Sequence, residues 1–194
     1  HLFSSAASDV YKRQIIGSNN DEYSLYFGGI ADVDGWLNAE VSDKQKNKLT
    51  NLLSNIDDPI RKLDLLITAK NFVCPSLLIA KTVNLSGGNS WVYQFNRVRD
   101  DPKALKYGAF HGAELPYVFD THDEWLPTND IDRKITEEVQ SYWVQFSKTG
   151  NPNLEQKMWG PYSAQTNSTF IINEKSYSSS HPSYEICKIM EPSW

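Results

Sequence analysis

The sequence predicts an α/β fold built around an incomplete, mostly parallel central sheet with packed helices. Segments with helical spacing of apolar residues alternate with short runs of β-branched and aromatic residues along the 194-residue chain. The strand-like runs are too few to complete such a sheet, and the first of them, at Ile15, resembles the end of a strand. We therefore expect part of a domain rather than a whole one.

The first fourteen residues, HLFSSAASDVYKRQ, join poorly to the segment that begins at Ile15. They lack the cationic region followed by an apolar region that marks a secretory signal. They resemble a translated adaptor sequence instead. We therefore expect residues 1–14 to be a non-native leader and residues 15–194 to be the native portion.

The first half of the native portion predicts one strand and three helices. Apolar residues recur at helical spacing with polar residues between them, as at Leu49, Leu53 and Ile56. Prolines suit the starts of two helices, and a Gly-Gly pair suits the end of the last one. The predicted elements are a strand end at 15–17, a polar turn at 18–21, and helices at 43–56, 60–70 and 76–84.

The second half predicts two strands, one long helix and a long irregular segment. The first strand is rich in aromatic and β-branched residues. The helix has an apolar stripe, can be capped by Asn129 or Asp130, and is closed by Gly150 before Pro152. The predicted elements are strands at 90–97 and 169–172, an irregular segment at 98–126, and a helix at 129–147.

Composition excludes some classes of function. The hydrophobic share of 40% and the charged share of 22% are those of an ordinary globular protein. The net charge is −5 and the basic residues are scattered, so we expect no nucleic-acid partner. No apolar stretch approaches the length that crosses a bilayer, so we expect no membrane span. The two cysteines, Cys74 and Cys187, lack metal-site spacing and could be two buried thiols or one disulfide.

A glycine-bounded loop carries the most informative single residue. His111 lies between Ala109 and Gly112, after the predicted strand at 90–97. A histidine held by a loop at an open cleft, with a pKa near working pH, can act as a general base. A structural histidine is the commoner use of such a residue, so the local sequence leaves both roles open.

The pattern Gly-x-x-His-Gly-x-Glu at 108–114 is similar to the catalytic-histidine loop of type-B carboxylesterases and cholinesterases, which are α/β-hydrolases. In that family the histidine takes a proton from a serine nucleophile and returns it to the leaving alkoxide. The resemblance therefore implies that His111 is the triad base. It also implies that residues 15–194 form the C-terminal portion of an α/β-hydrolase domain.

The segment Gly-Ser-Asn-Asn-Asp-Glu at 17–22 resembles the family's acid loop. Glu22 falls at the position of the triad glutamate that orients the imidazole. Tyr23 departs from the family pattern, which has glycine there. A solvated acidic turn is the alternative for Asp21 and Glu22, but the order acid before histidine fits the hydrolase arrangement.

Two further segments strengthen the resemblance, at 71–75 and at 146–162. The first resembles the family's Phe-x-Cys-Pro helix start, and the second its Thr-Gly-x-Pro-Asn stretch with a following Trp. The resemblance also implies a disulfide between Cys74 and Cys187, and hence export, so that the protein is secreted or periplasmic. In a eukaryotic secretory pathway, Asn84-Leu85-Ser86 and Asn167-Ser168-Thr169 are glycosylation sequons.

Several other residues have two interpretations. Glu114 could assist the pair from a second layer of the site, or could form a structural salt bridge. His122 and His181 lie in polar segments, and we expect both at the surface. Five aromatic residues could shape a substrate pocket, although core packing is the simpler role for most: Trp91, Tyr107, Phe110, Tyr117 and Phe119.

The chain contains no Gly-x-Ser-x-Gly nucleophile elbow and no Gly-rich oxyanion loop. The resemblance therefore implies a parent carboxylesterase that hydrolyses small-molecule carboxylic esters through an acyl-serine, with no metal or organic cofactor. This chain alone is expected to be inactive. The alternative is a non-catalytic, cholinesterase-like adhesion or binding protein, and the presence of both Glu22 and His111 argues against it.

Overall fold

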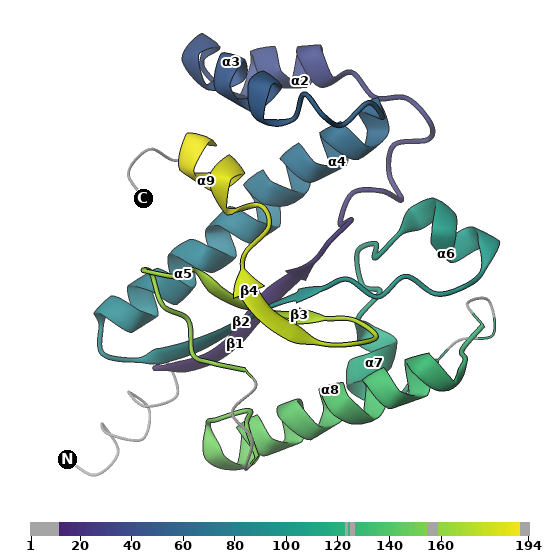
Figure 1. Cartoon of the computed structure of the whole chain (residues 1–194), viewed down its shortest axis with the longest axis vertical. Coiled ribbons are helices and arrows are strands. Elements are labelled where there is room, and N and C mark those ends of the chain that lie inside the picture. Colours follow the sequence, from purple (N-terminus) through teal and green to yellow (C-terminus); the bar gives the residue numbers. More distant parts are fainter. Residues whose placement is uncertain (1–11, 123, 125–126, 155–158, 191–194) are drawn as a thin grey trace.

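The computed structural model describes residues 12–122, 124, 127–154 and 159–190. Its centre is a four-stranded sheet in the order β1-β2-β3-β4, with helices on both faces (Figure 1). The predicted α/β class and the mostly parallel sheet are confirmed. Most of the predicted 1–14 leader, residues 1–11, lies outside the described residues.

The three predicted strands are present as β1 (Arg13–Asn19), β2 (Asn89–Phe95) and β3 (Ser168–Ile172). Both pairs, β1 with β2 and β2 with β3, are parallel. β1 is longer than expected at both ends. Arg13 and Gln14, which fall in the predicted 1–14 leader, pair with Asn89 and Ser90. Ser18 and Asn19 pair with the end of β2, so half of the predicted polar turn belongs to the strand. β4 (Tyr177–Ser180) is antiparallel to β3 and was not predicted, since its exposed Ser residues carry no strand pattern.

Alternate strand residues serve two separate cores, as the period of a strand requires. Ile16 and Val92 pack in the core that contains Leu66 and Leu77. Trp91 and Phe95 face the opposite core, which is rich in aromatic side chains. The sheet is therefore covered on both faces, which is the usual setting of parallel strands.

One continuous helix runs through α4 (Pro59–Thr68), the π-helical turn η1 (Ala69–Val73) and α5 (Cys74–Leu85). We expected two helices divided near Pro75. The wider π turn, in which the Cys74 N–H donates to the Ala69 carbonyl, precedes the proline and lets the helix continue.

The length of this helix corrects one expectation from the sequence. By length and composition alone, Pro59–Leu85 could cross a membrane, although 56% of its most apolar 18-residue window is buried inside the protein. We did not expect an apolar helix of this length, because we divided the segment at Pro75. Leu66, Val73 and Leu77 place the helix against the sheet as a core element.

Three more helices pack near this one: α2 (Val33–Glu40), α3 (Asp43–Leu52) and α9 (Tyr184–Met190). α3 ends four residues earlier than predicted. A disulfide joins Cys74, at the start of α5, to Cys187 in α9, across 113 positions of sequence. This confirms the disulfide implied by the family resemblance.

The opposite face is covered by α8 (Asp130–Thr149), where Asn129 is the N-cap and Gly150 ends the helix in the left-handed region (Figure 1). The predicted helix is thus confirmed. The segment expected to be irregular contains α6 (Pro102–Tyr107) and α7 (Leu115–Phe119). Each spans fewer than two helical turns, so neither has enough residues to show a helical pattern.

Candidate active site

Glu22 lies just beyond the carboxyl end of β1, at the sheet edge where open α/β sheets bind ligands. Its Oε1 accepts a hydrogen bond of 2.7 Å from the Asn19 backbone N–H. Only 5% of its side chain is exposed. The alternative of a solvated acidic turn is therefore excluded for this residue, because the carboxylate is buried and hydrogen-bonded.

His111 lies on the loop between α6 and α7. Gly108 and Gly112 on either side of it have φ of 67° and 83°, a region that favours glycine. Phe110 forms a parallel β-bridge with Asp21, the residue before Glu22. The two loops are therefore joined by backbone pairing next to both candidate residues.

Glu22 and His111 meet directly, although 89 positions separate them. Glu22 Oε2 lies 2.6 Å from His111 Nδ1. The imidazole packs at 5.4 Å from the Phe72 ring, and 52% of its side chain is exposed. Nε2 has no hydrogen-bond partner among the residues that the structure describes, which leaves it available to a group arriving from the open side.

The electrostatics of Glu22 reflect burial next to a titratable partner. Burial raises the pKa of Glu22, while the Asn19 N–H and the hydrogen bond to His111 act in the opposite direction without cancelling the rise. The neighbouring Glu114 carboxylate adds to the rise. A buried carboxylate facing a half-exposed imidazole can fix the Nδ1–H tautomer and stabilise the imidazolium.

Comparison with known proteins places the chain in a family. The family model described as "Carboxylesterase family" matches residues 3–189. The chain belongs to the carboxylesterase family.

Individual relatives agree with this assignment. The chain is 35% identical over 91 residues to the para-nitrobenzyl esterase of Bacillus subtilis, covering 44% of this chain and 18% of that protein. It is 29% identical over 90 residues to secreted lipase 5 of Gibberella zeae, covering 46% and 17%. Among solved structures, a PNB esterase matches with a TM-score of 0.74 and 25% identity, covering 92% of this chain and 38% of that one.

The matched segments cover less than a fifth of the length of these two relatives, and this carboxylesterase-family chain covers 38% of the PNB esterase structure. The structural match confirms an α/β-hydrolase fold over the part of the fold that is present.

Glu114 lies close to the Glu22–His111 pair but does not contact His111. Its Oε2 accepts a hydrogen bond of 2.5 Å from Asn19 Nδ2, and Asn19 also donates to Glu22 through its backbone. Asn19 therefore connects the two carboxylates. No salt bridge to Glu114 is found among the described residues, so the second of its two expected roles is not observed.

The remaining sequence candidates divide clearly. Trp91, Phe110 and Tyr117 are buried, as core packing predicts, whereas Phe119 is 66% exposed. His122 and His181 are not surface residues: both side chains are buried, and burial lowers the pKa of His181 to about 4. We expected them at the surface because their neighbours in the sequence are polar. In the structure, their ring nitrogens are hydrogen-bonded to the Thr136 hydroxyl and to the Ser183 N–H, respectively.

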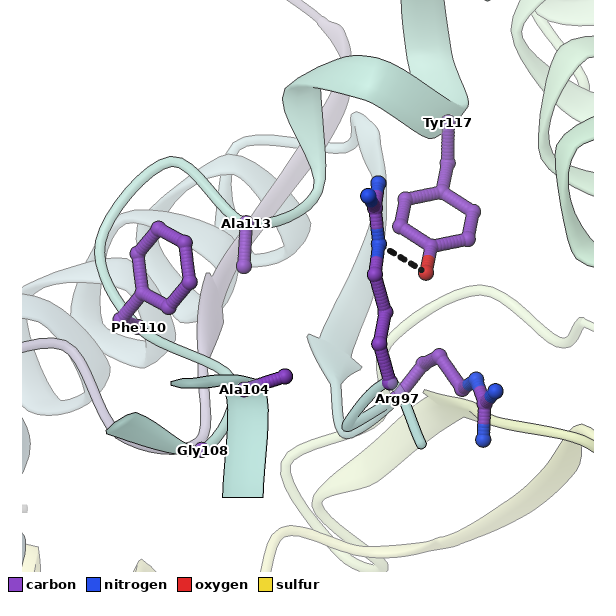
Figure 2. Close-up of a pocket in the computed structure, with 7 residues that line it drawn as sticks. Arg97, Ala104, Gly108, Phe110, Ala113 and Tyr117 are labelled. Atoms are coloured by element: carbon purple, nitrogen blue, oxygen red, sulfur yellow. Dashed lines mark hydrogen bonds between the residues drawn. The ribbon is translucent and has the colours of Figure 1, made fainter. Parts of the chain in front are cut away.

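A buried arginine cluster behind the histidine loop was not predicted. A small cavity there is lined by residues of the loop and of the segment after β2 (Figure 2). The dashed line in Figure 2 is the 3.2 Å hydrogen bond from Arg99 Nε to the Tyr117 hydroxyl. Arg97 pairs with Asp132, 2.8 Å away on α8. This cluster supports α7, which comes after the His111 loop.

Within the described residues, no group of three or more His, Cys, Asp or Glu residues is placed to hold a metal ion.

Proposed function

We propose that residues 15–194 are the C-terminal portion of a carboxylic ester hydrolase in which Glu22 and His111 are the acid and base of a Ser-Glu-His triad. The observation that carries this proposal is the 2.6 Å contact between Glu22 Oε2 and His111 Nδ1. Family membership supplies the reaction class, since this is the carboxylesterase family. The rest of the parent protein would supply the serine and the oxyanion donors.

In the proposed reaction, His111 Nε2 takes the proton of the serine hydroxyl as the serine oxygen bonds to the ester carbonyl carbon. The imidazolium then gives that proton to the alkoxide as the carbon–oxygen bond of the ester breaks, leaving an acyl-serine. Water then bonds to the acyl carbon as His111 Nε2 takes its proton. His111 returns that proton to the serine oxygen as the acyl–serine bond breaks, which releases the carboxylic acid. Glu22 holds Nδ1–H throughout and stabilises the positive charge.

The chain by itself is proposed to be inactive, because the pair has no nucleophile and no oxyanion donors to work with. We also propose export, to the exterior or the periplasm. The Cys74–Cys187 disulfide and the similarity to a protein named as a secreted lipase support that location. The substrate class is a small-molecule carboxylic ester.

The first experiment is to sequence the source nucleic acid upstream of the Ile15 codon. A continuous frame that encodes a strand, Gly-x-Ser-x-Gly and a helix is the expected result. A continuous frame without that serine would contradict the enzyme proposal and favour the adhesion alternative.

The second experiment measures hydrolysis of para-nitrophenyl acetate by the parent protein. His111→Ala is expected to lower kcat by about 10⁴ to 10⁶, and Glu22→Gln by about 10⁴. Glu137→Gln, on the exposed face of α8, is the matched control and should leave the rate unchanged. Full activity in His111→Ala would refute the assignment of the base.

A further inference from the structure

Asp21, the residue before Glu22, makes contacts that the proposed chemistry does not use. It is buried, and its Oδ2 accepts a hydrogen bond of 2.8 Å from the Ala109 N–H. Its own N–H donates to the Ala109 carbonyl at 3.0 Å. Asp21 thus forms hydrogen bonds to Ala109, two positions before His111, through both its backbone and its side chain.

The other side of Asp21 is held by helix α4. Arg61 forms an ion pair with Asp21 Oδ1 and a second one, of 3.1 Å, with Asp64 Oδ2. Asp64 Oδ1 in turn accepts a hydrogen bond of 2.8 Å from the Tyr23 N–H. The residues on both sides of Glu22 are therefore fixed to α4, while the loop carrying His111 is fixed to Asp21.

Gly108 makes this approach possible. Its φ of 67° is one that residues other than glycine rarely adopt, and a Cβ at this position would overlap the Asp21 carboxylate. A glycine at 108 therefore serves the Asp21 contact, and not only the turn that precedes the histidine.

We propose that Asp21 is a positioning residue that sets the separation of Glu22 and His111, with Arg61 holding its second oxygen. Asp21 touches neither the imidazole nor any reacting atom, so its effect passes through the two loops. The catalytic importance of this positioning rests on the proposed function. The positioning itself rests on the contacts alone and can be tested in this chain.

The test is NMR spectroscopy of the ¹⁵N-labelled chain, with two readouts: the low-field Nδ1 proton of His111 and the exchange rate of the Ala109 amide. Asp21→Ala should abolish the low-field proton and speed Ala109 exchange about tenfold or more, as loss of a hydrogen bond to a charged acceptor implies. Asp21→Asn keeps an acceptor for Ala109 and should recover part of both signals.

Asp100→Asn is the matched control, because Asp100 pairs at 3.0 Å with buried Arg97 but lies outside this site. It should leave both readouts unchanged. If Asp21→Ala does not fold, Arg61→Met provides the same comparison without touching the Ala109 contact directly, and should weaken the low-field signal.

Wild-type signals in folded Asp21→Ala, or in Arg61→Met where Asp21→Ala does not fold, would overturn the proposal. A parent protein without esterase activity would overturn the proposed function and leave these NMR results standing, so the two failures are distinguishable.

The two glycosylation sequons offer a second, independent inference, because their settings are opposite. Asn84 and Ser86 are exposed at the end of α5, next to a turn at Gly87. Asn167 is 7% exposed, and its Oδ1 accepts a hydrogen bond of 3.1 Å from the Tyr162 hydroxyl. Thr169 of the same sequon is buried in β3.

Resting on the proposed export, we infer that in a eukaryotic secretory pathway Asn84 is an acceptor site for an N-linked glycan and Asn167 is not. A glycan needs open space around the asparagine side chain, which α5 provides and the buried Asn167 does not. The disulfide between Cys74 and Cys187 fits passage through the oxidising compartment in which such glycans are attached.

The test is secretion of the chain from yeast, followed by mass measurement before and after enzymatic removal of N-glycans. One glycan is expected on the wild type, none on Asn84→Gln, and one on Thr169→Val, which destroys the second sequon with little change of volume. An unmodified wild type, or a glycan at Asn167 in Asn84→Gln, would overturn the inference.

Discussion

Two buried carboxylates, Glu22 and Asp132, are held in contrasting ways. Glu22 faces the half-exposed imidazole of His111, and burial raises its pKa. Burial acts in the same direction on Asp132, but hydrogen bonds from Arg97, the Asn129 N–H and Tyr117 outweigh it and lower its pKa. Burial raises the pKa of both carboxylates. The opposing hydrogen bonds cancel this rise only in part for Glu22 and exceed it for Asp132.

The difference lies in the partner. Arginine keeps its charge at every accessible pH, so Arg97, just after β2, favours the charged form of Asp132 on α8. Histidine can accept and release a proton, so the charge opposite Glu22 can change during a reaction. The first arrangement is suited to holding the fold, and the second to proton transfer.

The largest expected effect on stability comes from breaking the Arg97–Asp132 pair. Arg97→Met leaves Asp132 buried without its cation, and the free energy of unfolding should fall by about 3–5 kcal/mol. Urea denaturation provides the measurement. Arg133→Met, which removes an exposed pair with Asp120, is the control and should cost less than about 1 kcal/mol. Equal losses of unfolding free energy in the two variants would contradict the distinction between the buried Arg97–Asp132 pair and the exposed Arg133–Asp120 pair.

The pH dependence of stability should separate the two carboxylates. The lowered pKa of Asp132 means that its contribution is present above the ordinary carboxyl pKa and is lost as pH falls through the folded value, below about pH 4. The raised pKa of Glu22 has the opposite sign, so its contribution is present below its ordinary value of 4.5 and is lost as pH rises from there.

Unfolding free energies measured from pH 3 to pH 7 test these signs. Asp132→Asn should weaken the loss of stability on the acid side, whereas Glu22→Gln should weaken the loss on raising pH above about 4.5. The same change of slope in both variants would show that the two sites do not differ as described.

The smallest effect concerns the packing around the imidazole. Phe72 contacts the His111 ring at 5.4 Å, and Phe72→Ala should cost about 0.5–1.5 kcal/mol of stability by thermal unfolding. Phe119→Ala, at an exposed position, is the control and should change stability by less than about 0.5 kcal/mol. A loss above about 3 kcal/mol, the cost of a core aromatic, would mean that Phe72 serves the core and not the site.

Sequence reasoning predicted the strands of the parallel sheet and the long helix α8, because each carries a pattern of sufficient length. It did not predict β4, α6 or α7. β4 is a polar edge strand. α6 is specified by its local cap, Asp101, and α7 has only five residues, too few to show a helical period. The break expected near Pro75 was wrong because a π-helical turn absorbs the proline.

The candidate site was predictable only through motifs. His111 and Glu22 were each identified from a segment that resembles a family pattern, and the structure brings them into contact. No local signal indicated the Asp21–Arg61 contact or the Arg97–Asp132 pair, because their partners are 40 and 35 positions apart and meet only in the folded chain. The burial of His122 and His181 was missed because each lies in a polar segment of the sequence.

The most direct test of the Glu22–His111 pair is the NMR tautomer of His111 in this chain, compared between the wild type and Glu22→Gln. The wild type should carry its proton on Nδ1, with a low-field resonance that reports the short hydrogen bond to the carboxylate. Glu22→Gln should move that resonance upfield or lose it to exchange with water. A wild-type His111 protonated on Nε2 alone, or a Nδ1 resonance unchanged in Glu22→Gln, would contradict the pairing on which the proposed triad depends.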